Sequence, residues 1–286
     1  MALIVDAHLH VWRAQPAGPP GAATLVSPEE DVPIEEGLHV LDRHGVARAV
    51  LIQPVFPGED NRYVADCAAA CPDRLAAVCV VDPRAAGAED RLEHWVVGRG
   101  CRGLRLRPKL VDESAAFGPR SYSLWERARR LGIVISVLAN PEHLSTLAAL
   151  AARFPEVPIV LDHLAHPRLS EGVAGPGFQS LLSLVEFPNI HVKISGFYYF
   201  TTEPEPYHGC WDLVQALYDQ FGSDRLIWGS DFPHVERRTG YGSSLELVQH
   251  RLPFLSGSDR EKILGRNALR LYWPRDRQHG DPEQGG

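Results

Sequence analysis

The 286-residue sequence predicts an α/β fold, a single-domain (β/α)8 barrel, from three observations. Short aliphatic runs alternate with longer helical patterns at intervals of a few tens of residues, which is typical of repeated βαβ units. The strand candidates are almost continuously apolar, as expected for a parallel sheet covered on both faces. There are eight of them, and the first contains HLH where a doubly wound sheet usually has a glycine-rich phosphate loop.

In chain order, the expected strands are residues 3–12, 48–55, 75–83, 102–108, 133–140, 158–165, 191–197 and 225–233. Helical patterns fill the intervals; in residues 141–155, apolar residues recur three and four apart between two prolines. Loops 13–33 and 197–209 follow strands, so we expect them over the barrel mouth. The sequence predicts a barrel over 1–274 and a disordered tail over 275–286.

Charge and composition exclude several classes of protein. With 29 Lys and Arg against 36 Asp and Glu, the net charge is −7, which provides no general cationic field for nucleic acid or anionic lipid. No apolar run reaches the ~20 residues of a membrane span, and the start lacks a basic leader segment. Five scattered cysteines without a CxxC motif favour reduced thiols. We therefore expect a cytoplasmic protein without nucleic-acid or membrane partners; a homo-oligomer is compatible with this composition.

Titratable residues gather where several strands end. In a barrel enzyme the carboxyl ends of the strands converge on one pocket, so residues there are the candidates for chemistry. They are His8 and His10 on strand one, Arg105 and Arg107 on strand four, Asp162 and His163 on strand six, Lys193 and Ser195 on strand seven, and Ser230 and Asp231 on strand eight.

Three histidines and one aspartate form the predicted catalytic set. His8 and His10 project on the same face of a strand, as two ligands of one metal do. His163 at the mouth is placed to bind a metal or to donate to a substrate carbonyl. Among apolar neighbours, the pKa of Asp231 is expected to rise toward that of a general base unless a cation holds it down.

Buried cations at the mouth predict an anionic small-molecule substrate, because an unpaired buried cation is costly. Arg105, Arg107 and Lys193 are the candidate anchors, and pairing of the arginines with Asp6, Asp162 or Glu59 is the alternative. Ser195 and Tyr198 are further candidates for substrate contact. The sequence has no GxSxG motif and no phosphate loop ending in GK[ST], which favours water as the nucleophile.

Four segments, in this order, resemble the amidohydrolase superfamily: DAHLHVW, LDHLAHP, VKISG and IWGSDFPH. The resemblance covers residues 3–273 and is to the amidohydrolase-related branch of hydrolases, lactonases and decarboxylases. It implies a (β/α)8 barrel and assigns His8, His10, His163 and Asp231 to the catalytic or metal-binding positions.

The chain departs from the metal-dependent members of that branch at strand five, where ISVLANP lacks their further histidine ligand. Lys109 follows a proline and is a poor match for the carboxylated lysine of binuclear members. The pattern is closer to lactonase-like members, such as 2-pyrone-4,6-dicarboxylate lactonase and sugar lactonases, some of which work without a metal. The resemblance therefore implies either one divalent ion, Zn²⁺ or Mn²⁺, or metal-independent catalysis.

These observations favour a hydrolase that opens a lactone with an anionic or polyhydroxylated substrate. Asp231 would take a proton from water while the three histidines polarise the carbonyl, directly or through a metal. Metal-dependent decarboxylation of an aromatic or unsaturated acid is the alternative, and a non-catalytic ligand-binding barrel is a more remote one.

Overall fold

A computed structural model describes residues 3–14, 26–55, 58–108, 113–201, 203 and 207–274. In this part of the chain, eight parallel strands lie in sequence order from β1 to β8, which confirms the predicted fold class. The strands are β1 (Val5–Leu9), β2 (Arg48–Ile52), β3 (Leu75–Val80), β4 (Gly103–Leu106), β5 (Val134–Val137), β6 (Ile159–Leu161), β7 (Ile190–Ile194) and β8 (Leu226–Trp228). The predicted tail 275–286, Lys109 and part of loop 13–33 lie outside the described residues.

The first and last strands meet and nearly close the barrel. Leu9 forms a parallel bridge with Phe232. The amide of Asp231 donates to the His8 carbonyl at 2.8 Å, and the amide of His10 donates to the Phe232 carbonyl at 2.8 Å. These bonds connect β1 to the segment after β8, and we call this contact the β1/β8 seam.

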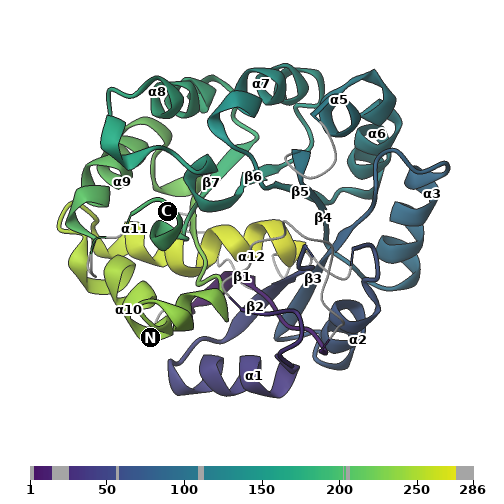
Figure 1. Cartoon of the computed structure of the whole chain (residues 1–286), viewed down its shortest axis with the longest axis horizontal. Helices are drawn as coiled ribbons and strands as arrows, with labels where there is room; N and C mark the ends of the chain where they lie inside the picture. Colours follow the sequence, from purple (N-terminus) through teal and green to yellow (C-terminus); the bar gives the residue numbers. More distant parts are fainter. Residues whose placement is uncertain are drawn as a thin grey trace, which may run out of the picture.

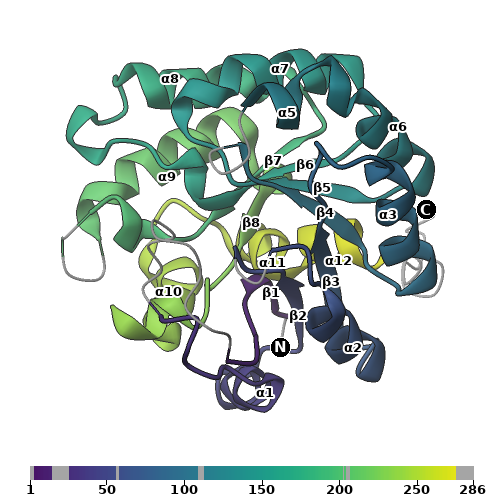
Figure 2. The ribbon, with the colours of Figure 1, turned by 45° about the vertical axis from the view of Figure 1, so that its right-hand side comes forward.

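Helices surround the sheet as an outer ring (Figures 1 and 2). The described helices are α1 (Ile34–Arg43), α2 (Arg62–Ala70), α3 (Ala88–Glu93), α5 (Glu113–Phe117), α6 (Tyr122–Leu131), α7 (Leu144–Arg153), α8 (Pro176–Ser183), α9 (His208–Phe221), α10 (Tyr241–Glu246), α11 (Gly257–Glu261) and α12 (Asn267–Tyr272). Each strand is buried along nearly its whole length, because helices cover the outer face and side chains fill the interior. None of the helices in the described ranges is both long and apolar enough to cross a bilayer.

The apolar core has two parts. The larger part lies between the sheet and the helix ring. The smaller part fills the barrel with inward side chains such as Val5, Val50 and Val134, and α12 packs against it through Ala268 and Tyr272. Because Val5 and Val134 are the first residues of their strands, α12 covers the amino ends of the barrel. The carboxyl ends are thus left for the polar residues.

All eight strands overlap the predicted ranges, but each ends two to five residues earlier than expected, and β6 and β8 have the largest shortfalls. Residues 163–166 have φ between 51° and 56°, a left-handed conformation that no strand adopts, so β6 stops at Leu161. Asp231 also has a positive φ, 62°, and β8 stops at Trp228. His163 and Asp231 therefore lie on turns just beyond the strands, not within them.

Candidate active site

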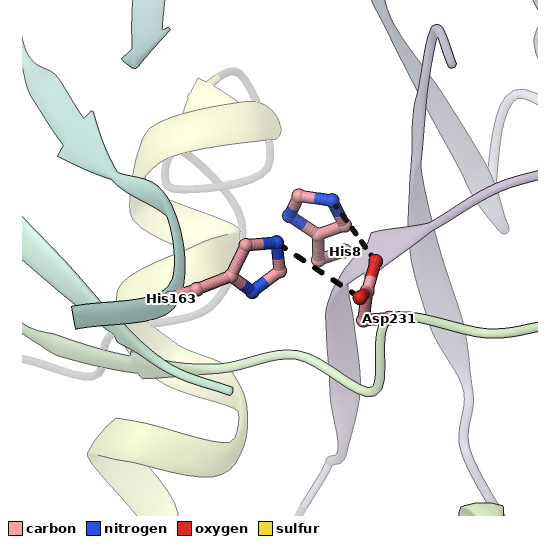
Figure 3. A group of neighbouring side chains, drawn as sticks. All are labelled: His8, His163 and Asp231. Atoms are coloured by element: carbon pink, nitrogen blue, oxygen red, sulfur yellow. Dashed lines mark ion pairs between the residues drawn. The ribbon is translucent and has the colours of Figure 1, made fainter. Parts of the chain in front are cut away.

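The four predicted catalytic side chains meet at the carboxyl end of the barrel. Figure 3 shows His8 on β1, His163 after β6 and Asp231 after β8, with both imidazoles directed at the carboxylate. His10 completes the group and, like the other three, is buried. Strand period places His8 and His10 on one face, and the β1/β8 seam brings Asp231 beside them.

One carboxylate oxygen and two ring nitrogens form a compact triangle. The Nε2 atoms of His8 and His10 lie 3.1 Å apart. Oδ1 of Asp231 lies 3.5 Å from Nε2 of His8 and 3.3 Å from Nε2 of His10. Within the described part of the chain, no donor makes a hydrogen bond to this oxygen, although it is buried. A buried, unsatisfied carboxylate oxygen indicates a place for a ligand, a water or an ion.

The other oxygen of Asp231 is engaged by the loop after β7. Tyr198 donates its hydroxyl to Oδ2, and Nε2 of His163 lies 4.0 Å from the same oxygen. The loop 197–209, predicted to cover the mouth, thus contributes a side chain to the site. Nδ1 of His163 lies 2.9 Å from Oγ of Ser195, so Ser195 orients a histidine in this structure.

Burial keeps His163 and His8 neutral, because a charged imidazole loses its hydration there. The pKa of His163 falls to about 3, and burial together with the Lys193 charge lowers the pKa of His8 well below its ordinary value. Burial alone raises the pKa of Asp231, but His163 and the other imidazoles outweigh it and hold that pKa well below its usual range. The expected rise in the pKa of Asp231 is therefore wrong, and the carboxylate is ionised at neutral pH.

Two of the three predicted anion anchors are paired inside the protein. Nζ of Lys193 donates to Oδ1 of Asp162 at 2.9 Å, and Arg105 donates to Oδ2 of the same carboxylate at 3.1 Å. Lys193 and Asp162 are fully buried, and Arg105 is 3% exposed. Arg105 is therefore paired with Asp162 inside the protein, which was the alternative to its role as an anchor for a substrate anion. This network lies directly behind His8, whose Nδ1 is 3.1 Å from Nζ of Lys193.

Arg107 differs from the other two cations. It is 8% exposed, and it donates a long hydrogen bond of 3.4 Å to the Pro54 carbonyl. Among the described residues, no carboxylate lies within 4 Å of its guanidinium. Burial and the neighbouring Arg105 lower its pKa to about 10, so it remains a cation at neutral pH. A buried cation without a carboxylate partner favours an anion from outside the protein.

Two residues at the site were not among the predicted catalytic or binding residues. Asp6 accepts hydrogen bonds from the amides of His8 and Ser230 and from the hydroxyls of Ser230 and Tyr241. No sequence pattern predicted this role of Asp6, because a register shift between Asp6 and Leu9 interrupts the alternation that places His8 and His10 on one face. His234 had no sequence signal either, because it follows Asp231 on an irregular turn.

His234 extends the cluster on the side of His10. A nitrogen of His234, one of His10 and an oxygen of Asp231 lie within 4.8 Å of one another, as do the corresponding atoms of His8, His163 and Asp231. Nδ1 of His234 is buried without a hydrogen-bond partner among the described residues. Burial lowers the pKa of His234 to about 4, so this ring is also neutral.

The donor set fits a divalent metal ion. Ligand atoms about 2.0–2.1 Å from a tetrahedral Zn²⁺ are roughly 3.3 Å apart, from the tetrahedral angle. The three sides of the His8, His10 and Asp231 triangle, 3.1, 3.5 and 3.3 Å, agree with that spacing. Neutral imidazole and ionised carboxylate are also the ligand forms that Zn²⁺ binds. The buried His and Asp group therefore suggests metal binding.

Comparison with known proteins gives relatives over nearly the whole chain. An L-fucono-1,5-lactonase of Burkholderia ambifaria is 31% identical, over 98% of this chain and 99% of the relative. A 2-pyrone-4,6-dicarboxylate hydrolase of Comamonas testosteroni is 26% identical, over 95% of this chain and 90% of the relative. The crystal structure of a Burkholderia multivorans amidohydrolase with bound zinc has the same fold, with a TM-score of 0.82, 23% identity, and coverage of 95% of this chain and 99% of that one.

The family resemblance inferred from four short segments is confirmed by these matches. Residues 5–273 match the amidohydrolase family, a range that includes every strand of the barrel and all four predicted catalytic residues. This chain belongs to the amidohydrolase family.

Proposed function

We propose that this protein is a hydrolase that opens a lactone ring by adding water to it, on a small substrate bearing a carboxylate or several hydroxyl groups. The observation that carries the proposal is the buried oxygen Oδ1 of Asp231, which has no hydrogen-bond donor in the described ranges and faces the Nε2 atoms of His8 and His10. The names of the relatives, a fuconolactonase and a pyrone-dicarboxylate hydrolase, support lactone hydrolysis.

Asp231 is the proposed base. Its carboxylate removes a proton from a water molecule at Oδ1 while the water oxygen bonds to the lactone carbonyl carbon. The ring C–O bond then breaks, and Asp231 returns the proton to the departing ring oxygen. Tyr198 keeps Oδ2 occupied throughout, so that Oδ1 is the oxygen directed at the reacting water.

The neutral histidines stabilise the charge that develops on the carbonyl oxygen. When the Ser195 hydroxyl donates to Nδ1 of His163, the histidine carries its proton on Nε2, on the side of Asp231. That N–H is available to the oxyanion, and a donor of this kind is worth on the order of 3 kcal/mol in the transition state. If the protein holds a divalent ion, His8, His10 and Asp231 are its proposed ligands, and the ion supplies Lewis-acid polarisation of the carbonyl.

Arg107 is the proposed partner for an anionic substituent. Its guanidinium is buried, and within the described ranges no carboxylate comes within 4 Å of it. A substrate carboxylate would accept a bidentate hydrogen bond there and would offset the cost of burying the charge. The surrounding residues favour Arg107 over Arg105 and Lys193, which are already paired with Asp162.

A titration of acid release on a panel of sugar lactones and carboxylated lactones tests the proposal. Asp231→Asn keeps the shape of the side chain but removes the base, and we expect a fall in kcat of at least a hundredfold. His163→Asn is expected to lower kcat by about a hundredfold through the lost donor. His191→Asn is the matched control, because His191 is also buried but lies on β7 away from the mouth.

Product analysis separates this proposal from the alternatives. Ring opening releases one acid group per turnover and no gas, whereas decarboxylation releases CO₂. Near-normal kcat in Asp231→Asn would refute the proposed mechanism. Thermal stabilisation by lactones without turnover across the panel would instead favour a ligand-binding barrel.

A further inference from the structure

Nδ1 of His8 has an unusual neighbour for a histidine in a metal-binding set. Nζ of Lys193 lies 3.1 Å from it, whereas Oδ1 of Asp162 lies 3.4 Å away. The lysine is itself 2.9 Å from that oxygen, so it takes the stronger hydrogen bond to the carboxylate. All three side chains are fully buried. The lysine is thus interposed where His8 would otherwise find a carboxylate acceptor.

The chemistry of the lysine fixes the position of the proton on His8. A lysine ammonium donates hydrogen bonds and accepts none. Its contact with Nδ1 of His8 is therefore a hydrogen bond only if that nitrogen bears a lone pair. Neutral His8 then carries its proton on Nε2, the nitrogen that faces His10 and Asp231.

The contacts of His10 agree with this position of the proton on His8. Nδ1 of His10 lies 2.7 Å from the carbonyl oxygen of Ile52, which only accepts, so that nitrogen carries the proton. Nε2 of His10 is then the acceptor of the pair, and it lies 3.1 Å from Nε2 of His8. One chain of donors follows, from Lys193 to His8, from His8 to His10, and from His10 to Ile52. Every contact in it has a donor and an acceptor.

Metal-binding histidines have the opposite arrangement. They present a bare nitrogen to the ion and donate the other N–H to a carboxylate or a carbonyl. His10 meets this requirement through Ile52, but His8 does not while Lys193 donates to it. The set of donor atoms at the triangle fits an ion, whereas the lysine behind His8 opposes ion binding.

We propose that Lys193 is a positioning residue that holds His8 in the tautomer with the proton on Nε2 and thereby weakens metal binding at the site. In the metal-free protein His8 is then a hydrogen-bond donor, not a ligand. The inference rests on the proposed function only in taking His8 and His10 as members of the site. The experiments that test the inference measure a histidine tautomer and a zinc affinity, and neither depends on turnover. The inference can therefore fail while the lactonase proposal holds, and the lactonase proposal can fail while the inference holds.

The first measurement is the tautomer of His8 in the full-length, metal-free wild-type protein. Two-bond ¹H–¹⁵N correlation spectra of ¹⁵N-histidine-labelled protein distinguish the two neutral forms, and His8→Asn assigns the signals. We expect a protonated Nε2 on His8 and a protonated Nδ1 on His10. A protonated Nδ1 on His8 overturns the proposal, and this measurement needs no variant of Lys193 to fold.

The second measurement is zinc affinity, by competition with a chromophoric chelator. In Lys193→Met the carboxylate of Asp162 becomes available to Nδ1 of His8, and we expect zinc to bind about tenfold more tightly or better, the scale of outer-shell effects on metal sites. Arg105→Met is the matched control, because Arg105 is also a buried cation paired with Asp162, but its hydrogen bonds among the described residues go to Asp162 and Gln53 and not to His8. We expect less than a threefold change there.

Comparing zinc affinity in the two variants separates an effect of the His8 tautomer from an effect of the lost positive charge alone. Equal tightening in both variants would mean that only the lost positive charge matters, and would overturn the proposal, as would unchanged or weaker binding in Lys193→Met. Additional loss of His10 in the double variant Lys193→Met/His10→Asn must abolish the tight site, which assigns the zinc to this cluster.

Discussion

Asp6 gives the most direct test of how the barrel holds its site. The carboxylate is fully buried and accepts four hydrogen bonds. Oδ1 receives the amides of His8 at 3.0 Å and Ser230 at 2.9 Å, and Oδ2 receives the hydroxyls of Ser230 at 2.6 Å and Tyr241 at 2.9 Å. Asp6 thus connects β1 to the turn that carries Asp231, and we expect Asp6→Asn to disturb stability and catalysis together.

The cost of Asp6→Asn follows from these four bonds. An amide oxygen can still accept from the two backbone amides, but the amide nitrogen replaces an acceptor that faces two hydroxyls. Both hydroxyls must rotate and accept instead. Each of these two bonds changes from charge-assisted to neutral, at a cost of about 1 kcal/mol per bond. The expected loss of unfolding free energy is about 2 kcal/mol, or about 3 °C in Tm for a chain of this length.

Calorimetry and lactone turnover on the same protein samples measure both effects. We expect the Tm loss to come with at least a tenfold fall in kcat, because the His8 amide and the Ser230 hydroxyl lose their common anchor. Asp42→Asn is the control, an identical change at a carboxylate that is 62% exposed and paired with Arg74 at the surface. If Asp6→Asn matches Asp42→Asn in both Tm and kcat, Asp6 does not organise the site.

Three further predictions concern the substrate, the backbone and pH. Arg107→Met should raise KM at least tenfold for carboxylated lactones and leave neutral sugar lactones nearly unchanged, which initial rates on both classes measure. In Gly196→Ala, at φ +68°, the new Cβ would lie 2.6 Å from Nδ1 of His163, so kcat should fall tenfold or more. Gly132→Ala is the control, because Gly132 has a similar φ of +63° but open space around it; this variant should lower stability and leave kcat unchanged. Burial lowers the pKa of His191 to about 4 in the folded protein, below the ordinary value of 6.5. Between pH 6.5 and pH 4 the unfolded chain therefore binds a proton that the folded protein does not, and the free energy of unfolding falls by about 3 kcal/mol at most as the pH is lowered through this range. His191→Leu should flatten urea-unfolding stability over that pH range.

Eight almost continuously apolar runs, separated by helical patterns, were sufficient to predict the barrel, because a parallel sheet covered on both faces leaves those signals in a single sequence. They also located the residues at the mouth, since strand ends converge in this fold. His8 and His10 were placed on one face correctly, and their ring nitrogens lie 3.1 Å apart. Catalytic roles for these residues remain predictions.

The partners of the buried cations could not be predicted in the same way. Asp162 is 57 residues from Arg105 and 31 from Lys193, and no local pattern fixes which oxygen each cation reaches. The left-handed turn over residues 163–166 also has no glycine to announce it, so β6 was expected to run too far. Both features depend on tertiary packing, which outweighs local preference at these positions.

The seam that closes the barrel is also the structure that assembles the site. The amide of Asp231 donates to the His8 carbonyl, and Asp6 accepts from both sides of the contact. Asp231, the proposed base, two of the histidines and the closing hydrogen bonds therefore belong to one unit. Local opening of that unit should abolish turnover before the rest of the barrel unfolds. Under mild urea, hydrogen exchange at the His10 and Asp231 amides should accelerate together with the loss of activity, while amides of β4 and β5 stay protected. We expect this coupling because three of the four predicted catalytic residues, His8, His10 and Asp231, lie at the contact that closes the barrel, where opening the seam also separates their side chains.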